Sequence, residues 1–370
     1  MRFSPLLFLF LLSAPVWGQL NNRVFEDRMA VNSADSGKLY LGVNTLGFFK
    51  NNEYKQTIIE GYTLFGYQFQ PFLSYHLTPK LRLDAGAFLQ KDFGNDKYSM
   101  STPIFSLKWR SGDYSIIFGN LEGSLNHRLI EPLYDFERVL NRRLESGVQF
   151  QVNRDGLFAD AWLDWQYMQY WKDSKQEQLV GGLSIVKRLA RIGSGELSLP
   201  FQVVARHQGG QLDTAGLPIQ TVVNTAIGLS WTQPLNGWVN EASLSGYYVY
   251  DKDITTTRQP YLDGDGVYVN GSITTKFGLQ LMASYWQARE YLSIEGGPIY
   301  QSISTQDGVR LQPSPHLVMA RFLYNYPVSD QLTLSLRYEP FYDFAFSTFQ
   351  YSYGFYINYL ARYFLANTRQ

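Results

Sequence analysis

Hydrophobic and polar positions alternate along the C-terminal stretch at residues 349–365. The odd positions are apolar or aromatic throughout, whereas the even positions are mostly small or polar, as at Ser352, Gly354 and Asn358. A period of two is typical of a β-strand and not of a helix. Strands of soluble proteins usually span about 3–10 residues, and a tilted strand needs about 9–11 residues to cross a bilayer. The stretch therefore predicts a membrane-crossing strand with one face toward lipid and the other toward water.

The same alternation recurs along the whole chain. It is found at residues 65–77, 81–89, 148–153, 197–206 and 332–339. Each of these segments is a weak signal by itself, but their repetition indicates an all-β fold, a single antiparallel transmembrane β-barrel. The alternative is a large soluble β-sandwich, which gives no reason for long strands joined by connections of alternating length.

The connections between the expected strands are alternately short and long. Short turns rich in Gly, Pro, Asn, Asp and Ser are expected at residues 78–80, 111–113, 153–156, 192–196, 233–237, 276–278 and 328–331. Longer polar loops are expected at residues 51–60, 91–98, 122–145, 172–177, 209–220, 251–266 and 293–315, with a short one at 345–348. Outer-membrane barrels have short periplasmic turns and longer external loops, so the pattern predicts about 16 strands (roughly 14–18) and both chain ends in the periplasm.

The first 18 residues have the features of a secretory signal peptide. Arg2 supplies the positive start, and Leu6 to Leu12 form an apolar core well short of the roughly 20 residues of a transmembrane helix. We expect residues 1–18 to be removed. Residues 19–36 show no clear period and are predicted to form a periplasmic N-terminal segment, and residues 37–366 are predicted to form the barrel.

Composition narrows the class of protein further. The chain has no cysteine, which excludes disulfides and thiolate metal sites. A mean hydropathy of −0.22 and the lack of a second long apolar run argue against a helical membrane protein. Equal numbers of acidic and basic residues, 32 of each, give no indication of a nucleic-acid partner. Neither a phosphate-binding glycine loop nor a zinc spacing is found, so we expect no cofactor and no metal.

Aromatic residues, 16% of the chain, occur beside both kinds of connection, with Trp109 and Trp231 near short turns and Trp171 and Tyr250 near long loops. Such rings form two girdles at the membrane interfaces. In its signal, strand number, connections and girdles the chain resembles Gram-negative outer-membrane porin-type β-barrel proteins, without a close match to a porin motif. The resemblance implies a location in the cell outer membrane. The chain departs from many such barrels in that Phe364 is not its last residue.

The loop at residues 122–145 is the main candidate for a functional site. In the general porins that the chain resembles, the loop after the fifth strand folds inward and narrows the pore, which would make this loop a constriction. The second half of the loop has the spacing of a short helix, with Pro132 in its first turn. Charges at a constriction select solutes by their field; the candidates are Arg128, Glu131, Asp135, Glu137, Arg138, Arg142 and Arg143. The alternative is an external loop with solvated charges.

Charged residues at inward positions of the strands form a second set. Arg or Lys exposed to lipid at mid-membrane costs about 2–4 kcal/mol, so these side chains should face water. They are either a solute track or cross-strand pairs in a solvated lumen. The candidates are Arg82, Asp84, Asp160, Asp164, Arg206, Arg321, Arg337, Glu339 and Arg362.

A catalytic site receives little support from the sequence. The chain has four histidines, and His127 has Ser124 and Asn126 as neighbours, but closeness in sequence does not establish the geometry of a triad. We therefore predict that the chain is not an enzyme and has no catalytic residues.

The function predicted from the sequence is that of a porin-like channel for passive diffusion of small hydrophilic solutes. A barrel of 16–18 strands leaves an aqueous channel unless a segment plugs it. The alternatives are the barrel of a polysaccharide or protein export machine, and a structural or adhesive outer-membrane barrel. The expected partners are outer-membrane lipid and a small solute or polymer, and homo-oligomers are common among similar barrels.

Overall fold

The computed structural model describes residues 20, 22–55, 58–210, 214–255, 259–305 and 307–368. The predicted signal peptide at residues 1–18 lies outside these residues. The described chain is dominated by strands, and its helices contain only three or four residues each. These are η1 (Arg23–Phe25), η2 (Ser33–Asp35), η3 (Ser124–His127), α1 (Arg138–Asn141) and η4 (Pro298–Tyr300). Within the described ranges, no helix has the length and apolar character needed to cross a membrane.

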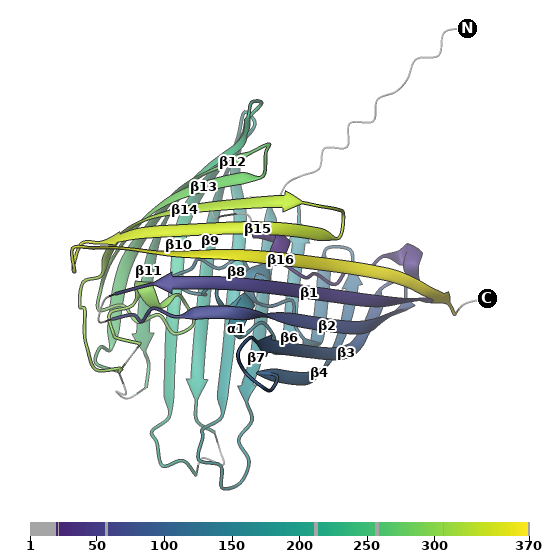
Figure 1. Cartoon of the computed structure of the whole chain (residues 1–370), viewed down its shortest axis with the longest axis horizontal. Helices are drawn as coiled ribbons and strands as arrows, with labels where there is room; N and C mark the ends of the chain where they lie inside the picture. Colours follow the sequence, from purple (N-terminus) through teal and green to yellow (C-terminus); the bar gives the residue numbers. More distant parts are fainter. Residues whose placement is uncertain are drawn as a thin grey trace.

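In the part of the chain that the structure describes, sixteen strands close into one antiparallel barrel, as the sequence predicts. Their bounds are β1 (Lys38–Glu53), β2 (Thr63–Thr78), β3 (Leu81–Asp92), β4 (Met100–Ser111), β5 (Tyr114–Asn120), β6 (Ser146–Arg154), β7 (Leu157–Tyr167), β8 (Gln178–Ile192), β9 (Gly195–Gln208), β10 (Gln220–Pro234), β11 (Val239–Asp253), β12 (Asp263–Thr275), β13 (Leu279–Arg289), β14 (His316–Pro327), β15 (Leu332–Asp343) and β16 (Thr348–Asn367). Each strand pairs with the next one in the chain, and β1 closes the barrel by pairing with β16. In Figure 1, β1 and β14–β16 run across β8–β11 behind them, as tilted strands on opposite walls of a barrel do.

Alternation along each strand separates the lipid-facing side from the interior. On β16, Phe349 is 62% exposed and Phe355 is 38% exposed, whereas Ser352, Tyr356 and Asn358 are buried. The apolar positions of the strand therefore form the outer surface, and the small or polar positions face inward. This confirms the two-sided strand that the sequence pattern predicts.

The barrel interior is packed with chain segments and is not an open tube. Four described segments enter it: residues 22–31 and the connections from β1 to β2, from β5 to β6 and from β13 to β14. Leu133, Tyr291 and Tyr300 from the last two connections are buried against Trp286 of β13. From the N-terminal segment, Phe25 packs edge-to-face on the ring of Tyr356 of β16, with ring centroids 5.2 Å apart. These side chains form an apolar core inside the strand wall.

Candidate functional site

The loop from β5 to β6, residues 121–145, lies inside the barrel. Its helix is much shorter than the sequence spacing predicts, because only Arg138–Asn141 is α-helical and the residues after Pro132 form turns. Ser124 and Arg128 have positive φ angles of 52° and 60°, a strained backbone region for residues other than glycine. Ser124 is the first residue of η3 and Arg128 directly follows it, so both ends of the short helix that carries His127 are strained. Apolar side chains of the loop pack on the barrel interior, including Ile130 and Leu133.

His127 lies at the centre of a buried polar cluster. Its Nδ1 is 2.9 Å from Oδ2 of Asp160 on β7, and its Nε2 is 2.8 Å from Oε2 of Glu145. The ring stacks on Trp162, with centroids 3.7 Å apart. Burial disfavours the charged ring, but the two carboxylates outweigh burial and raise the pKa of His127 from 6.5 to about 9. His127 is therefore an imidazolium at neutral pH, clamped between two anions.

Glu145 joins this cluster to the rest of the loop. Its Oε1 accepts hydrogen bonds from the backbone N–H of Ser124 at 2.7 Å and from the hydroxyl of Tyr134 at 2.7 Å. Burial opposes ionisation of Glu145, but His127 and these donors prevail and lower its pKa to about 2. The carboxylate stays ionised across the physiological pH range and holds the two ends of the loop together.

A cavity of about 70 Å³ lies beside this cluster, between the N-terminal segment, the loop and strands β2–β4. Ser124 lines the cavity and is buried, and its hydroxyl has no hydrogen-bond partner among the described residues. Arg143 and Arg362 also line it. The cavity is large enough for water-sized groups and has a hydroxyl, guanidinium groups and carboxylates in its wall.

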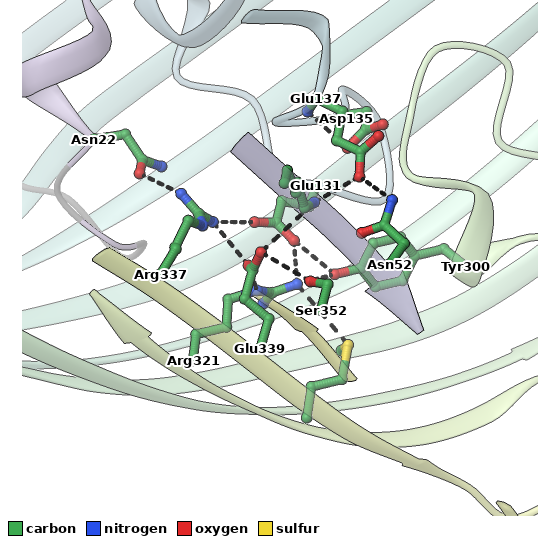
Figure 2. A network of polar contacts seen from close by, with 12 residues as sticks. Asn22, Asn52, Glu131, Asp135, Glu137, Tyr300, Arg321, Arg337, Glu339 and Ser352 are labelled. Atoms are coloured by element: carbon green, nitrogen blue, oxygen red, sulfur yellow. Dashed lines mark hydrogen bonds and ion pairs between the residues drawn. The ribbon is translucent and has the colours of Figure 1, made fainter. Parts of the chain in front are cut away.

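A second network joins the loop to the opposite wall of the barrel (Figure 2). Glu131 of the loop binds Arg321 of β14, and its Oε1 is 3.7 Å from Nη2 of Arg337 on β15. Glu339, also on β15, binds both arginines at 3.0 and 2.9 Å. Tyr300 donates its hydroxyl to Glu131 at 2.9 Å. Two guanidinium groups are thus balanced by one carboxylate from the loop and one from the wall.

Glu137 extends this network to β1. Lys50 is 2.5 Å from Glu137 and 3.7 Å from Glu339, and so connects the two carboxylates. Asn52 and Tyr62 also donate to Glu137. Burial would raise the pKa of Glu137, but Lys50 and these donors lower it. The group is therefore a buried carboxylate held in its ionised form.

The pKa of Asp135 shifts in the direction opposite to that of Glu137. Burial, with the negative charge of Glu137 beside it, raises the pKa of Asp135 to about 7. Of the remaining residues of the expected constriction, Arg138 and Arg142 share Glu295, whereas Arg143 and Arg128 lie elsewhere. Arg138 binds Glu295 from the connection between β13 and β14, Arg142 reaches Gln166, Arg143 donates to Gln68 and to the carbonyl of Phe25, and Arg128 stacks 3.6 Å over the ring of Phe158. The seven candidates therefore anchor the loop at several points and do not form one ring around a pore.

Inward strand positions carry the other candidates, and most of them bind an interior segment or a neighbouring charge. Asp160 binds His127, Asp164 accepts from the N–H of Ser146, Arg206 donates to the carbonyl of Ile294, Arg82 pairs with Asp84 and donates to the carbonyl of Ala30, and Arg362 binds Asp27. Arg321, Arg337 and Glu339 belong to the network with Glu131. The wall charges are thus partners of the enclosed segments.

The N-terminal segment, expected to lie in the periplasm, has its described residues 22–30 inside the barrel. Asn22 accepts from Arg337 at 2.8 Å, and the N–H of Met29 donates to Glu122 at 2.6 Å. Arg28 donates to Asn126 at 3.1 Å. The segment thus contacts both the wall and the inward loop. Its polar residues have no periodicity that could have indicated this position.

Sequence reasoning also missed four residues of the site. Lys50, Glu145 and Glu295 were not singled out, although each holds a charge of the inward loop. Gly296 was also overlooked. A Cβ at Gly296 would lie 2.2 Å from the carbonyl oxygen of Pro132, so only glycine allows the two inward connections to approach this closely. Lys50 could have been found from the sequence, because it is a charged residue in a strand otherwise rich in apolar residues.

Comparison with solved structures shows the same fold. OprD from Pseudomonas aeruginosa is similar with a TM-score of 0.52 and 11% identity, over 90% of this chain and 98% of that one. OpdL from the same organism has a TM-score of 0.50 and 13% identity, over 88% and 99% of the two chains. A loop-deletion mutant of OmpT from Vibrio cholerae has a TM-score of 0.51 and 13% identity, over 88% and 100%. These are outer-membrane proteins, and their fold agrees with the one expected from the sequence. No curated protein sequence matches this chain.

A sequence-family model gives a more specific result. The model described as lipid A 3'-O-deacylase-type matches residues 31–368. The prediction that the chain is not an enzyme is therefore wrong, because the family that it matches is named for an enzyme. The sequence argument found no catalytic geometry among neighbouring residues. In the fold the partners of His127 come from strand β7 and from the end of the loop. Since the match spans nearly the whole barrel, this chain belongs to the lipid A 3'-O-deacylase-type family.

Proposed function

We propose that this chain hydrolyses an acyl ester of a glycolipid in the outer membrane, with the cluster around His127 as its reaction centre. The family match supports the reaction class. The observation that carries the assignment is the buried imidazolium between Glu145 and Asp160, next to a cavity lined by the unbonded hydroxyl of Ser124. Perturbed histidines beside a cavity are frequent in catalytic sites.

Ester hydrolysis needs a nucleophile, a stabilised oxyanion and a proton for the departing alkoxide. His127 holds a proton at neutral pH and can supply it to the alkoxide. Both ring nitrogens are engaged, so the transfer requires Nε2 to exchange its bond with Glu145 for one with the substrate. Asp160 then keeps the ring oriented through Nδ1. The hydroxyl of Ser124, or a water in the cavity beside it, is the nucleophile. Its proton passes to Glu145, which lies next to Ser124 and is released when Nε2 turns to the substrate, and it returns from Glu145 to the imidazole after the alcohol leaves.

Access to the cluster requires movement. A cavity of about 70 Å³ admits water-sized groups and not a glycolipid. The N-terminal segment forms part of the cavity wall through Phe25, Asp27 and Met29. A substrate ester can therefore reach Ser124 only when this segment or the loop withdraws.

The test is the acylation state of lipid A in cells that express the chain, measured by mass spectrometry. Wild type should remove acyl groups, His127→Asn should abolish the reaction, and His207→Asn, on the distant strand β9, should leave it unchanged. Ser124→Ala distinguishes the two nucleophiles. Loss of deacylation would identify the hydroxyl of Ser124, which would form an acyl-enzyme, and retained deacylation would identify a water. Lipid A identical with and without wild type would overturn the proposed activity, and full activity of His127→Asn would overturn its location.

A second candidate function is the channel for passive diffusion of small hydrophilic solutes. The closed barrel of 16 described strands, whose fold is similar to that of OprD, favours it. In this case the enclosed segments are plugs. Planar-bilayer recordings should show higher conductance after deletion of residues 22–30 or 125–142 than in wild type. Equal conductance of the three proteins would contradict the channel. Assembly into a homo-oligomer remains a prediction, which cross-linking in membranes would test.

A further inference from the structure

A larger cavity, of about 390 Å³, lies at the end of the barrel that carries the short turns. Turn residues 153–156 and Asp113 form its rim, and Arg188 and Glu196 belong to the adjoining strands. Because short turns face the periplasm, the cavity opens on that side. Its volume lies within the usual range for small-molecule sites.

Positive charge gathers at the inner part of this cavity. Arg28 of the N-terminal segment and Arg128 of the inward loop both line it. Burial and the charges of Arg28 and Arg23 act on Arg128 and lower its pKa to about 9, with Glu26 opposing them. Glu26 pairs with Arg28 at 2.9 Å. The three guanidinium groups thus lie near two carboxylates, Glu26 and Asp160, and Asp160 is also bound to His127, which leaves an excess of positive charge.

The rim does not offset this excess. Arg188 binds Asp155, and its Nη1 is 3.0 Å from Glu196, so the charges of these three side chains belong to one paired group. Arg154 adds a guanidinium to the lining and Asp113 adds a carboxylate, so the formal charges of these two cancel. The balance of the cavity is therefore basic at its inner part and close to neutral at its mouth, which favours entry of an anion.

Two details indicate a prepared site. Arg128 has a left-handed backbone with φ 60°, and the Cζ atom of its guanidinium lies 3.6 Å from the centroid of the Phe158 ring. These two features hold the side chain in place before any ligand arrives. Ser198 also lines the cavity, is 1% exposed, and its hydroxyl has no hydrogen-bond partner among the described residues. A buried hydroxyl without a partner is costly, and a bound anion would satisfy it.

We propose that this cavity binds a phosphate group, with Arg28 and Arg128 as its cationic ligands and the hydroxyl of Ser198 as a further donor. A phosphate has several acceptor oxygens and suits guanidinium groups that approach from different elements. The group belongs to inorganic phosphate or a small phosphorylated solute, or to the headgroup of a phospholipid. The site is separate from the His127 cluster and does not depend on the proposed hydrolysis.

Isothermal titration calorimetry of the folded full chain in detergent tests this site, with inorganic phosphate as the probe. Saturable binding is expected, with a dissociation constant of about 1 mM or lower and weaker at higher salt. Arg28→Gln and Arg128→Gln should each weaken binding by about 10-fold or more, because each removes a charge-assisted hydrogen bond. Ser198→Ala should weaken it by a smaller factor.

Arg191→Gln is the matched control. Arg191 binds Asp155 and Glu196, the partners of Arg188, but it does not line the cavity. Its loss removes the same charge from the same end of the barrel and should change phosphate affinity by less than about 2-fold. Arg28 lies partly exposed on an interior segment, so Arg28→Gln tests the site even if Arg128→Gln fails to fold.

Short-chain phosphatidic acid, compared with phosphatidylcholine of the same chain length, distinguishes the two sources of the phosphate. Binding of inorganic phosphate alone assigns the site to soluble phosphate, and binding of phosphatidic acid alone assigns it to a lipid headgroup. Binding of neither probe, or equal affinity of wild type, Arg28→Gln and Arg128→Gln, would overturn the proposal.

Discussion

The clamp on His127 predicts that barrel stability depends on pH above neutrality. Glu145 and Asp160 raise the pKa of His127 from 6.5 to about 9 against the effect of burial. A group whose pKa is higher in the folded state stabilises that state fully below its unfolded pKa, and the contribution is lost as the pH rises through its folded pKa. The difference between 9 and 6.5, at about 1.4 kcal/mol per pKa unit, corresponds to about 3 kcal/mol.

Urea unfolding in detergent, followed by tryptophan fluorescence at several pH values, measures this contribution. The free energy of unfolding of wild type should fall by about 3 kcal/mol between pH 6.5 and pH 9.5. His127→Asn should be less stable at pH 6.5 and should lose most of this pH dependence. Glu145→Gln should move the loss to lower pH, since one of the two charges that hold the proton is gone. A wild-type stability that does not change over this interval, or the same slope in His127→Asn, would refute the clamp.

Three further predictions concern the packing of the barrel and can be measured by the same unfolding experiment. Lys50→Met leaves Glu137 and Glu339 without their shared cation and should lower the free energy of unfolding by about 3–5 kcal/mol. Lys97→Met, in an exposed loop, should lower it little. Similar values for the two variants would contradict the network. Gly296→Ala should cost about 1–3 kcal/mol, because its Cβ would lie 2.2 Å from the carbonyl of Pro132; full stability would show that the two connections do not touch. Leu229→Arg, on the outward face of β10, should lower the free energy of unfolding by about 2–4 kcal/mol in a bilayer. The control is Leu217→Arg in a loop, where Leu217 has the same 53% exposure as Leu229, and it should cost less than about 1 kcal/mol. Equal costs would mean that Leu229 does not face lipid.

The strand wall could be predicted because its cause is local. Each strand has lipid on one side and the barrel interior on the other. The apolar ring of Phe349 therefore indicates the lipid-facing side, and the polar side chain of Ser352 indicates the inward side. Turn residues then give the strand number, because alternating short and long connections follow from the topology. Neither step requires knowledge of a contact between distant parts of the chain.

The contents of the barrel could not be predicted in this way. A polar loop that lies in the external solvent and one that lies inside a polar lumen have similar compositions. The deciding contacts for residues 121–145 are long-range, since Glu131 meets Arg321, 190 positions later in the chain. The position of the N-terminal segment is even harder to predict, because Asn22 binds Arg337, which lies 315 positions later in the chain. Only the presence of the charges could be read from the sequence, and not their partners.

The charges of the wall and of the enclosed segments form one complementary set. Asp160 matches His127, Arg321 matches Glu131, and Arg362 matches Asp27. A wall charge facing water would not need a partner on an enclosed segment, whereas an unpaired buried charge would be costly. The inward-facing charges are therefore better understood as anchors for the loop and the N-terminal segment than as a track for solutes. The same pairing limits what the interior can release: withdrawal of a segment exposes several unpaired charges at once, so it requires either water to enter or a ligand that replaces the lost partners.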